Sequence, residues 1–484
     1  MSNKHFDILI LGAGLSGIGA ACHITRKFKK KKSYAILERR QNIGGTWDLF
    51  RYPGIRSDSD MTTFGYNFRP WRASKVLADG ESIRNYVKET AEKYDVVPNI
   101  HFGRKVVDAQ WSSKDSQWTV TTQDEGSGKK ETWTAQYLIG ATGYYNYDEG
   151  YRPEFPGEKK FKGEIVHPQH WPEDLDVAGK RVVVIGSGAT AITLVPSLAK
   201  LGAKVTMLQR TPTYVLSIPA IDPLWHSLSR VLPVKAVYAA TRTRNIALQR
   251  TLYTTAQQRP NAVRRLLRQQ ARLQLGKNVD VKHFMPDYNP WDQRLCVVPD
   301  GDLFKSLRKG ESRIVTDHIK SFDAKGIELK SGEHLDADII VTATGLNIQL
   351  LGGTKLTVDG KPVDLKERMV YKGMMLEGVP NALAIIGYTN ASWTLKSDIV
   401  TEHFCRMIRH ADKIGAKTVT ALPVKAKRLE DTVMGSLQSG YVARGADHLP
   451  RQGSKAPWVL LNDYVQDAAK LKFGKLTNPD LRFQ

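Results

Sequence analysis

Two short clusters of glycines are the residues of this chain whose types and spacing could do chemistry. They share the pattern Gly-x-Gly-x-x-Gly/Ala, and they are Gly12, Gly14 and Gly17 in the first cluster and Gly186, Gly188 and Ala191 in the second. In a strand–turn–helix unit this spacing lets the backbone approach a pyrophosphate, and the helix N-terminus adds free N–H groups and partial positive charge. Two such units predict two dinucleotides, and we expect a flavin and a nicotinamide.

The first cluster lies in the order of elements that a dinucleotide-binding unit requires. A buried strand is predicted at residues 7–11, a helix at 18–28 and a second strand at 34–37, which is followed by Glu38. An acid about 20 residues beyond the glycines can accept hydrogen bonds from a ribose hydroxyl. This order of strand, glycines, helix, strand and acid predicts that the first unit binds FAD.

The second cluster has a different residue type in place of that acid. A helix is expected at 189–198 and a strand at 204–208, and the chain then continues into Arg210 and Thr211. An acid there would repel a 2′-phosphate, whereas Arg210 can pair with it bidentately and Thr211 can donate a hydrogen bond. We therefore expect NADPH rather than NADH in the second unit.

Length and composition agree with a multidomain enzyme of a reducing compartment. A chain of 484 residues with 41% hydrophobic content can form about two or three domains with substantial cores. The three cysteines lie far apart and form no Cys-x-x-Cys, so neither a disulfide framework nor a metal site is expected. Residues 8–25 carry no charge, but a cleaved signal there would destroy the first glycine cluster. We expect a cytoplasmic protein.

The positive charge is concentrated in one segment. The formal net charge is +22, and residues 220–277 contain eleven Lys and Arg against one acid, Asp222. A helical segment of this kind is a solvated face, a nucleic-acid patch or an anchor on an anionic membrane surface. Because no nucleic-acid-binding motif accompanies it, we expect no nucleic-acid partner. A solvated face and peripheral binding at the inner face of the membrane stay open.

Several motifs outside the glycine clusters resemble those of one enzyme family. They are Gly44-Gly45-Thr46-Trp47, the segments 52–58 (YPGIRSD), 161–171 (FKGEIVHPQHW), 209–211 (QRT) and 289–295 (NPWDQRL). Together they resemble the motif set of the class B flavoprotein monooxygenases, the Baeyer–Villiger monooxygenases. Segments 144–151, 167–176 and 387–393 are similar to the subgroup that holds the ethionamide-activating and long-chain alkane monooxygenases.

The resemblance implies a reaction and two catalytic residues. In the family, reduced flavin captures O2 as a C4a-peroxyflavin, which attacks a ketone carbonyl and leads to an ester. Both the peroxide and the adduct that it forms with the ketone carry negative charge, so a fixed cation in a dry site stabilises the transition state. The family motif makes Arg294 that cation, and it makes Asp58 the acid that holds Arg294 by an ion pair.

The remaining site residues are expected to bind the two cofactors. The residues assigned to FAD are Gly12, Gly14, Ser16, Gly17, Glu38, Thr46, Trp47, Arg56, Asp58 and Val106. The residues assigned to NADPH are His167, Gly186, Ser187, Gly188, Ala189, Thr190, Ala191, Arg210 and Thr211. In the family the linker histidine, here His167, positions the domains and the nicotinamide, and a role as general base is the alternative.

The expected fold is α/β, with two Rossmann-like dinucleotide-binding domains and a helical insertion. The FAD domain is expected at residues 1–145 and 380–484, and the NADPH domain at 146–219 and 315–379. The basic helical insertion at 220–314 delivers Arg294 near its C-terminal end.

The predicted function is an NADPH- and O2-dependent FAD monooxygenase that converts ketones to esters. The same reactive flavin can oxidise thioethers or thioamides, so S-oxidation is a further expected activity. Two alternatives are a terminal hydroxylase of long-chain alkanes at a membrane or oil surface and a membrane-associated nucleotide-binding module without oxygenation. The expected partners are O2 and a hydrophobic small molecule, while the natural substrate and the oligomeric state are left open.

Overall fold

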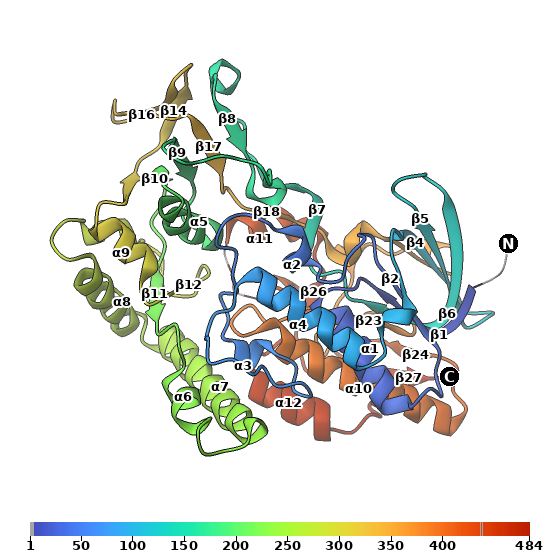
Figure 1. Cartoon of the computed structure of the whole chain (residues 1–484). Coiled ribbons are helices and arrows are strands. Elements are labelled where there is room, and N and C mark those ends of the chain that lie inside the picture. The colour runs from blue at the N-terminus through green and yellow to red at the C-terminus, as the bar shows by residue number, and fades with distance from the viewer. Residues whose placement is uncertain (1–3, 436, 438) are drawn as a thin grey trace.

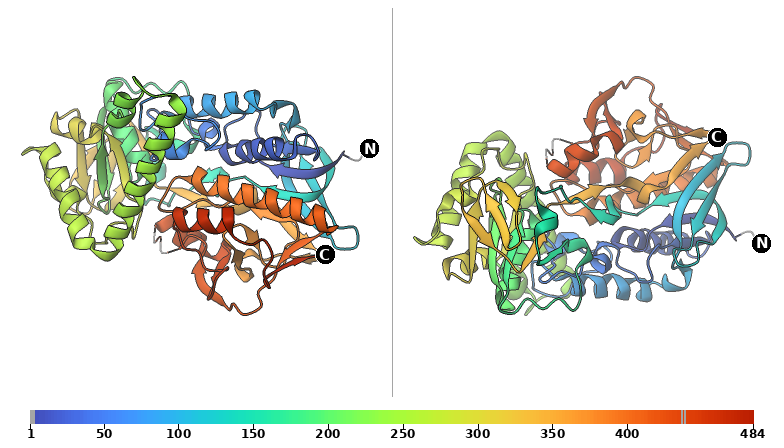
Figure 2. Two further views of the ribbon diagram at one scale, coloured as in Figure 1. Left: turned by 90° about the horizontal axis from the view of Figure 1, so that it is seen from below. Right: turned by 90° about the horizontal axis from the view of Figure 1, so that it is seen from above.

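Two large β-sheets, one mixed and one parallel, divide the chain into two units. The computed structural model describes residues 4–435, 437 and 439–484 (Figure 1). In both views of Figure 2 the two termini lie at one end of the molecule, and the green helices of residues 223–275 lie at the other end. The helices of residues 223–275 therefore lie far from both termini.

The first unit contains a sheet of nine strands in the described chain. Their order is β20 (Lys361–Pro362), β19 (Lys355–Val358), β4 (Lys105–Ser112), β5 (Gln117–Gln123), β6 (Lys130–Gly140), β1 (Lys4–Leu11), β2 (Tyr34–Leu37) and β3 (Ile100–His101), and β23 (Ala382–Ala384) also pairs with β6. Strand β1 is parallel to both β2 and β6. Its residues Ile8 to Leu11 are buried, as expected of a central parallel strand covered on both faces.

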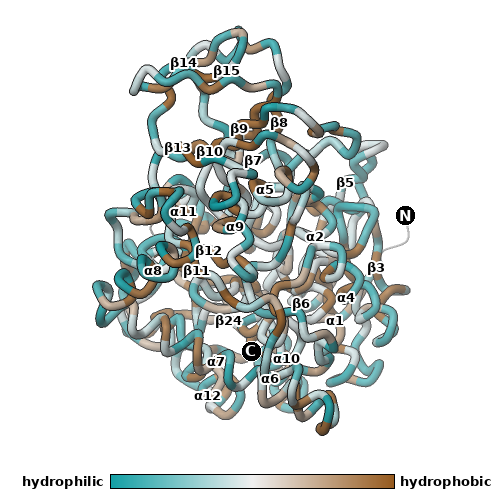
Figure 3. Tube along the Cα trace, turned by 60° about the vertical axis from the view of Figure 1, so that its left-hand side comes forward, coloured by the Kyte–Doolittle hydropathy of each residue, from teal (hydrophilic) through white to brown (hydrophobic). Residues whose placement is uncertain are grey.

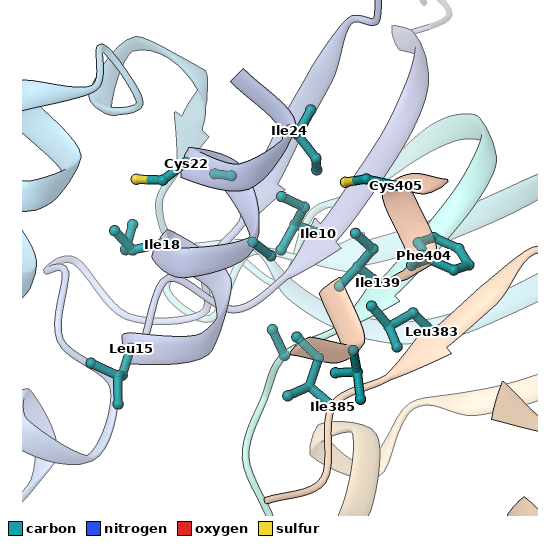
Figure 4. Packing of buried hydrophobic residues seen from close by; sticks show 14 of the residues in the cluster. Ile10, Leu15, Ile18, Cys22, Ile24, Ile139, Leu383, Ile385, Phe404 and Cys405 are labelled. Carbon is teal, nitrogen blue, oxygen red and sulfur yellow. The ribbon is translucent and has the colours of Figure 1, made fainter. Parts of the chain in front are cut away.

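Helices α1 (Leu15–Phe28), α4 (Gly80–Lys93) and α10 (Trp393–Ile414) cover this sheet. Figure 4 shows Leu15, Ile18 and Cys22 of α1 in one cluster with Phe404 and Cys405 of α10. All five side chains are buried, so both cysteines act as small apolar core residues. Packing of α1 against α10 fixes the position of the first glycine turn.

The second unit has a five-stranded parallel sheet. Its order is β13 (Ser312–Thr316), β10 (Lys204–Gln209), β9 (Arg181–Ile185), β17 (Ile339–Thr342) and β8 (Glu164–Val166), and α5 (Ala189–Lys200) and α9 (Asp302–Arg308) pack on it. The strands of this sheet are among the most hydrophobic segments in Figure 3. A small antiparallel sheet of β14 (Ile319–Phe322), β15 (Gly326–Leu329) and β16 (His334–Asp336) extends the unit.

The basic segment forms helices beside the second sheet. They are α6 (Pro223–Leu228), α7 (Val234–Gln258) and α8 (Pro260–Leu275). A parallel pair, β11 (Val215–Ile218) and β12 (Cys296–Pro299), brackets these helices in the sequence and brings their two ends together. Arg294 lies just before β12, so the pairing of β12 with β11 fixes the position of the Arg294 backbone.

Strand pairing places the domain boundaries differently from the sequence prediction. Residues 355–362 were assigned to the NADPH domain, but β19 forms a parallel ladder with β4 and so belongs to the first sheet. The chain therefore returns to the first unit before residue 355, not at 380. Helix α9, assigned to the insertion, packs on α5 of the second unit. The chain passes from the first unit to the second along β7 (Tyr145–Gly150), which pairs with β18 (Leu346–Ile348).

Short elements complete the first unit. They are α2 (Thr46–Leu49), α3 (Met61–Phe64), β21 (Val370–Tyr371), β22 (Met375–Leu376), β24 (Val419–Ala421), β25 (Arg428–Thr432), α11 (Gly440–Gly445), β26 (Arg451–Gly453), α12 (Tyr464–Phe473) and β27 (Leu481–Phe483). Among the described residues, no helix combines the length and the apolar character needed to cross a membrane.

Candidate active site

The first glycine turn joins β1 to α1 with no room for side chains at its base. Gly12 has φ +98°, and a Cβ on Gly17 would lie 1.8 Å from the Gly12 carbonyl oxygen. Gly14 caps α1, and a Cβ there would meet only Gly45, at 3.5 Å. Gly17 is therefore required by the fold, whereas Gly14 leaves the helix N-terminus open. These are the properties of a turn that can hold a pyrophosphate.

Glu38 closes the other side of this turn. Its side chain is 5% exposed, and its carboxylate accepts the backbone N–H of Ala13 at 2.6 Å and that of Arg40 at 2.8 Å. Burial raises the pKa of Glu38, and the two backbone hydrogen bonds oppose that shift. Each carboxylate oxygen keeps a further acceptor position, so Glu38 can also accept a ribose hydroxyl.

A cavity of about 710 Å³ runs from this turn to the helical insertion. The predicted FAD residues that line it are Gly12, Gly14, Ser16, Glu38, Thr46, Trp47, Arg56, Asp58 and Val106, and the only one that does not is Gly17, which supports the turn from behind. Ala189 and Thr190 of the second unit line the same cavity. The cavity thus reaches from the first glycine turn to the start of α5, while Gly186, Ser187, Gly188, Arg210 and Thr211 do not line it.

The second glycine turn has the same construction. Gly186 has φ +137°, and a Cβ there would lie 2.3 Å from the carbonyl oxygen of Ala343, while a Cβ on Gly188 would meet nothing within 4 Å. The Ser187 hydroxyl donates to the Thr211 carbonyl at 3.0 Å. The turn is thus tied to the loop after β10, and Gly188 leaves the N-terminus of α5 accessible.

Three predicted NADPH residues differ in how they can act at this turn. Arg210 and Thr211 are exposed and follow β10 directly, where a 2′-phosphate could reach both. Ala191 is fully buried, so its small size serves helix packing rather than ligand contact.

Arg294 and Asp58 meet inside the cavity. The Arg294 Nη1 atom lies 3.2 Å from Asp58 Oδ2, although 236 residues separate them in the chain. The Arg294 Nη2 atom donates to the Tyr144 hydroxyl at 3.4 Å. Its negatively polarised neighbours, Tyr144 first, raise the pKa of Arg294 well above its usual value, and burial opposes them. The cavity therefore contains a permanent cation held from two sides.

Residues 5–222 match the family described as flavin-binding monooxygenase-like. The chain is 54% identical over 481 residues to the probable FAD-binding monooxygenase AlmA of Acinetobacter baylyi, covering 99% of this chain and 96% of that protein. It is 50% identical over 482 residues to the FAD-containing monooxygenase EthA of Mycobacterium tuberculosis, covering 99% and 98%. The chain belongs to this family of flavin-binding monooxygenases.

Solved structures of more distant proteins show the same fold. An oxidised steroid monooxygenase bound to NADP superimposes with a TM-score of 0.72 at 24% identity, covering 87% of this chain and 88% of that one. An open crystal structure of cyclohexanone monooxygenase gives a TM-score of 0.75 at 18% identity over 100% of both chains. The predicted α/β fold with two dinucleotide-binding units is confirmed, and the relatives named above confirm that the motifs indicated a flavin-dependent monooxygenase.

Two predicted cofactor residues of this family member lie where the units meet. Arg56 lines the cavity, and its Nη1 atom lies 2.5 Å from Asp302 Oδ2 in α9, so the side chain also joins the units. His167 does not line the cavity. Its Nδ1 atom accepts the Gln169 N–H at 3.2 Å, and its Nε2 atom is buried without a partner in the described chain.

The surroundings of His167 favour a structural role. Burial is the main cause that lowers the pKa of His167, so the ring is neutral at physiological pH. A Cβ on Gly150 would lie 2.0 Å from this ring, so the ring is packed closely against β7 at the crossing. A neutral ring outside the cavity suits the positioning role better than that of a general base.

Sequence reasoning missed a polar cluster that holds the insertion against the cavity. The Asp60 carboxylate accepts the side-chain amides of Asn245 at 2.7 Å and Gln249 at 2.6 Å, both from α7. It also accepts the hydroxyls of Thr62 and Thr63, each at 2.6 Å. No local pattern in the sequence indicates these contacts, because Asp60 and the α7 amides lie more than 180 residues apart.

Proposed function

We propose that the protein is an NADPH- and O2-dependent FAD monooxygenase that inserts one oxygen atom into ketones to give esters. The overall reaction converts ketone, O2, NADPH and a proton into ester, NADP⁺ and water. The observation that carries the proposal is the Arg294–Asp58 ion pair in a cavity that the first glycine turn and the first residues of α5 border. Oxidation of sulfur in thioethers or thioamides is a second reaction of the same site.

The residues present fit both cofactors. The open Gly14 position at the N-terminus of α1 receives the FAD pyrophosphate, and Glu38 receives a ribose hydroxyl. The open Gly188 position at α5 receives the NADPH pyrophosphate, and Arg210 pairs with the 2′-phosphate. Bound together, NADPH supplies a hydride and FAD supplies the chemistry that reduces and activates O2.

Arg294 acts on the charge that develops at the substrate. When a ketone carbonyl carbon is attacked, its oxygen gains negative charge, and a fixed guanidinium in a cavity with apolar walls stabilises that charge. Asp58 orients the guanidinium through Nη1. The cavity lining also includes Ile218, Leu252 and Leu295, whose apolar side chains suit a hydrophobic ketone.

The test is Arg294→Ala in the flavin-loaded enzyme. We expect NADPH to reduce the flavin at a rate within about twofold of the parent, because hydride transfer needs no oxyanion stabiliser. Ester formation should fall about 10²- to 10³-fold, the range for removal of one preorganised oxyanion donor. Ester formation at the parental rate would refute the role of Arg294. The control is Arg308→Ala, since Arg308 is exposed on α9 and does not line the cavity.

The two alternative functions have less support. Hydroxylation of an alkane places no developing anion on the substrate, so the Arg294–Asp58 pair favours the oxidation of ketones over it. Product identification with a ketone and an alkane of equal chain length separates these reactions. A nucleotide-binding module without oxygenation does not agree with membership of a monooxygenase family.

We further propose that the basic helices bind an anionic membrane surface at the inner face of the cell membrane. Several of their cations already serve the fold. Arg242 is buried, and Arg244 and Arg250 pair with Asp222 and Asp463. The basic residues that stay exposed outside these pairs are Arg230, Lys235, Arg259, Arg265, Arg268, Arg272 and Lys277.

Exposed apolar side chains lie among these cations. Val231 is 75% exposed in the turn between α6 and α7, with Arg230 and Lys235 close to it in sequence, and this turn lies at the lower edge of Figure 1. Leu273 of α8 is 73% exposed, next to Arg272. Apolar side chains flanked by cations are suited to the headgroup region of an anionic bilayer.

Co-sedimentation with vesicles tests this association. The protein should sediment with anionic vesicles at 0.1 M salt and be released at 1 M, because the Debye length falls from about 10 Å to about 3 Å. Neutral vesicles are the control. Protein that stays in the supernatant with anionic vesicles at low salt would show that these helices are only a solvated face.

A further inference from the structure

Two consecutive tyrosines lie against Arg294 where the chain leaves β6. The Arg294 Nη2 atom is 3.4 Å from the Tyr144 hydroxyl, which in turn is 2.7 Å from the Tyr145 hydroxyl. Tyr144 is 5% exposed, and both tyrosines line the cavity. Neither tyrosine takes part in the cofactor binding or the charge stabilisation proposed so far.

The donor and acceptor roles in this group follow from chemistry. Arginine has no acceptor, so Arg294 donates and the Tyr144 oxygen accepts. The Tyr144 proton is then free to point to the oxygen of Tyr145. Burial raises the pKa of both tyrosines, that of Tyr145 to about 12, so both stay neutral phenols.

The guanidinium depends on few partners for its orientation. Asp58 holds Nη1 and Tyr144 holds Nη2, while Nε is buried with no hydrogen-bond partner in the described chain. If the Tyr144 contact is lost, only the contact to Asp58 remains, and the group can rotate about it. A guanidinium that rotates stabilises a developing anion less well than a fixed one.

The ring of Tyr144 is itself held by the segment 387–393, which the sequence analysis singled out. It stacks on Trp393 with ring centroids 5.1 Å apart and an interplanar angle of 18°. The Trp393 indole N–H donates to the Ser16 hydroxyl at 2.8 Å, in the first turn of α1. A Cβ on Gly387 would lie 2.2 Å from the Trp393 ring, so glycine makes room for this stack.

We propose that Tyr144 is a positioning residue that fixes Arg294 for oxygenation, with Tyr145 orienting its hydroxyl and Trp393 linking its ring to the first nucleotide-binding turn. This inference rests on the proposed function of Arg294. The role belongs to the Tyr144 oxygen as an acceptor. The reduction of flavin by NADPH does not require it.

The test is Tyr144→Phe in the flavin-loaded enzyme, because phenylalanine keeps the stack on Trp393 and removes the acceptor. We expect unchanged FAD content and an unchanged rate of flavin reduction. The kcat for ester formation should fall about tenfold, which corresponds to about 1.4 kcal/mol, with KM for the ketone within about threefold. More of the consumed NADPH should appear as hydrogen peroxide. Tyr145→Phe should show a smaller loss of ester in the same direction.

Tyr137→Phe is the matched control. Tyr137 is fully buried away from the cavity, and its hydroxyl has no hydrogen-bond partner in the described chain. Its loss should leave kcat and the peroxide yield unchanged. An equal effect in Tyr137→Phe and Tyr144→Phe would overturn the inference, because it would show a general effect of removing a buried hydroxyl.

A double-mutant cycle separates this inference from the proposed function. If Tyr144 acts through Arg294, Tyr144→Phe should cause no further loss in an Arg294→Ala background. A further tenfold loss in that background overturns the role of Tyr144 and leaves that of Arg294 intact. The same holds if Tyr144→Phe alone forms ester and hydrogen peroxide in the parental ratio and at the parental rate. Full ester formation in Arg294→Ala overturns both.

Discussion

Alanine at Gly14 should weaken FAD binding without disturbing the apoprotein. Gly14 has φ −77°, which alanine adopts without strain, and the new Cβ would lie at an ordinary contact distance of 3.5 Å from the Gly45 Cα. Replacing glycine by alanine at a helix N-cap costs up to about 1 kcal/mol. The lower entropy of the unfolded chain offsets about 0.4–1 kcal/mol of that cost. The net change in apoprotein stability should therefore be close to zero.

The effect on the cofactor is larger because the methyl group enters the cavity. Gly14 lines this space, and beyond the neighbouring residues of its own turn and helix only atoms of Gly45 in the described chain lie within 4 Å of the new Cβ. A pyrophosphate displaced from the N-terminus of α1 loses at least one hydrogen bond between a charged group and an amide, which is worth about 1.5–3 kcal/mol. The Kd for FAD should rise roughly 10- to 150-fold.

Flavin fluorescence titration of the apoprotein measures this Kd, and thermal unfolding of the apoprotein measures its stability. Gly17→Ala is the contrasting variant, because its Cβ would lie 1.8 Å from the Gly12 carbonyl oxygen. It should lower the unfolding temperature of the apoprotein as well as FAD affinity. If Gly14→Ala binds FAD within twofold of the parent, the pyrophosphate does not approach Gly14 and the proposed FAD position is incorrect.

Three further changes test the coenzyme site and the packing around the cavity. Arg210→Ala should weaken NADPH more than NADH by about 1.5–3 kcal/mol, and equal losses in KM for both coenzymes would exclude contact with the 2′-phosphate. Asp60→Ala should leave two side-chain amides of α7 without their acceptor and destabilise the docked insertion by about 2–4 kcal/mol. Hydrogen exchange should then become faster in α7 than in the parent protein, while exchange in α1 stays unchanged. Lys396→Met should remove the ammonium that lies 2.6 Å from Asp467 Oδ2 and leave the partly buried carboxylate with the Tyr388 hydroxyl as its donor. Urea unfolding should show a loss of about 1–3 kcal/mol, and an unchanged stability would contradict this reasoning.

The nucleotide-binding turns could be predicted because their signals are local. An apolar strand, glycines at fixed spacing and the next strand lie within about 30 residues, as in any βαβ unit. The side chain after the second strand, Glu38 or Arg210, then distinguishes the two turns without knowledge of the tertiary structure. The positions of Gly12, Gly17 and Gly186 could be predicted for the same reason, since their backbone conformations and close contacts belong to the turns themselves.

The contacts between distant segments could not be predicted in this way. Asp60 meets α7, Arg56 meets Asp302 and Tyr144 meets Trp393, and each pair is separated by well over 100 residues. Residue types alone do not select such partners, because many other acids and aromatic residues are available in the chain. The boundary near residue 355 was missed for the same reason, since β19 is a short strand whose sequence does not indicate which sheet it joins.

The proposed catalytic pair lies at the junction of the two units. Asp58 comes from the loop before α3, Tyr144 from the chain that leaves the first sheet, and Arg294 from the end of the insertion. Arg56 and Asp302 join the same units by a second ion pair. Because the guanidinium is held by partners on the other unit, a shift of about 1 Å between the units would break its hydrogen-bond geometry. If Arg294 acts as proposed, the contacts that hold the units together should influence oxygenation as well as stability.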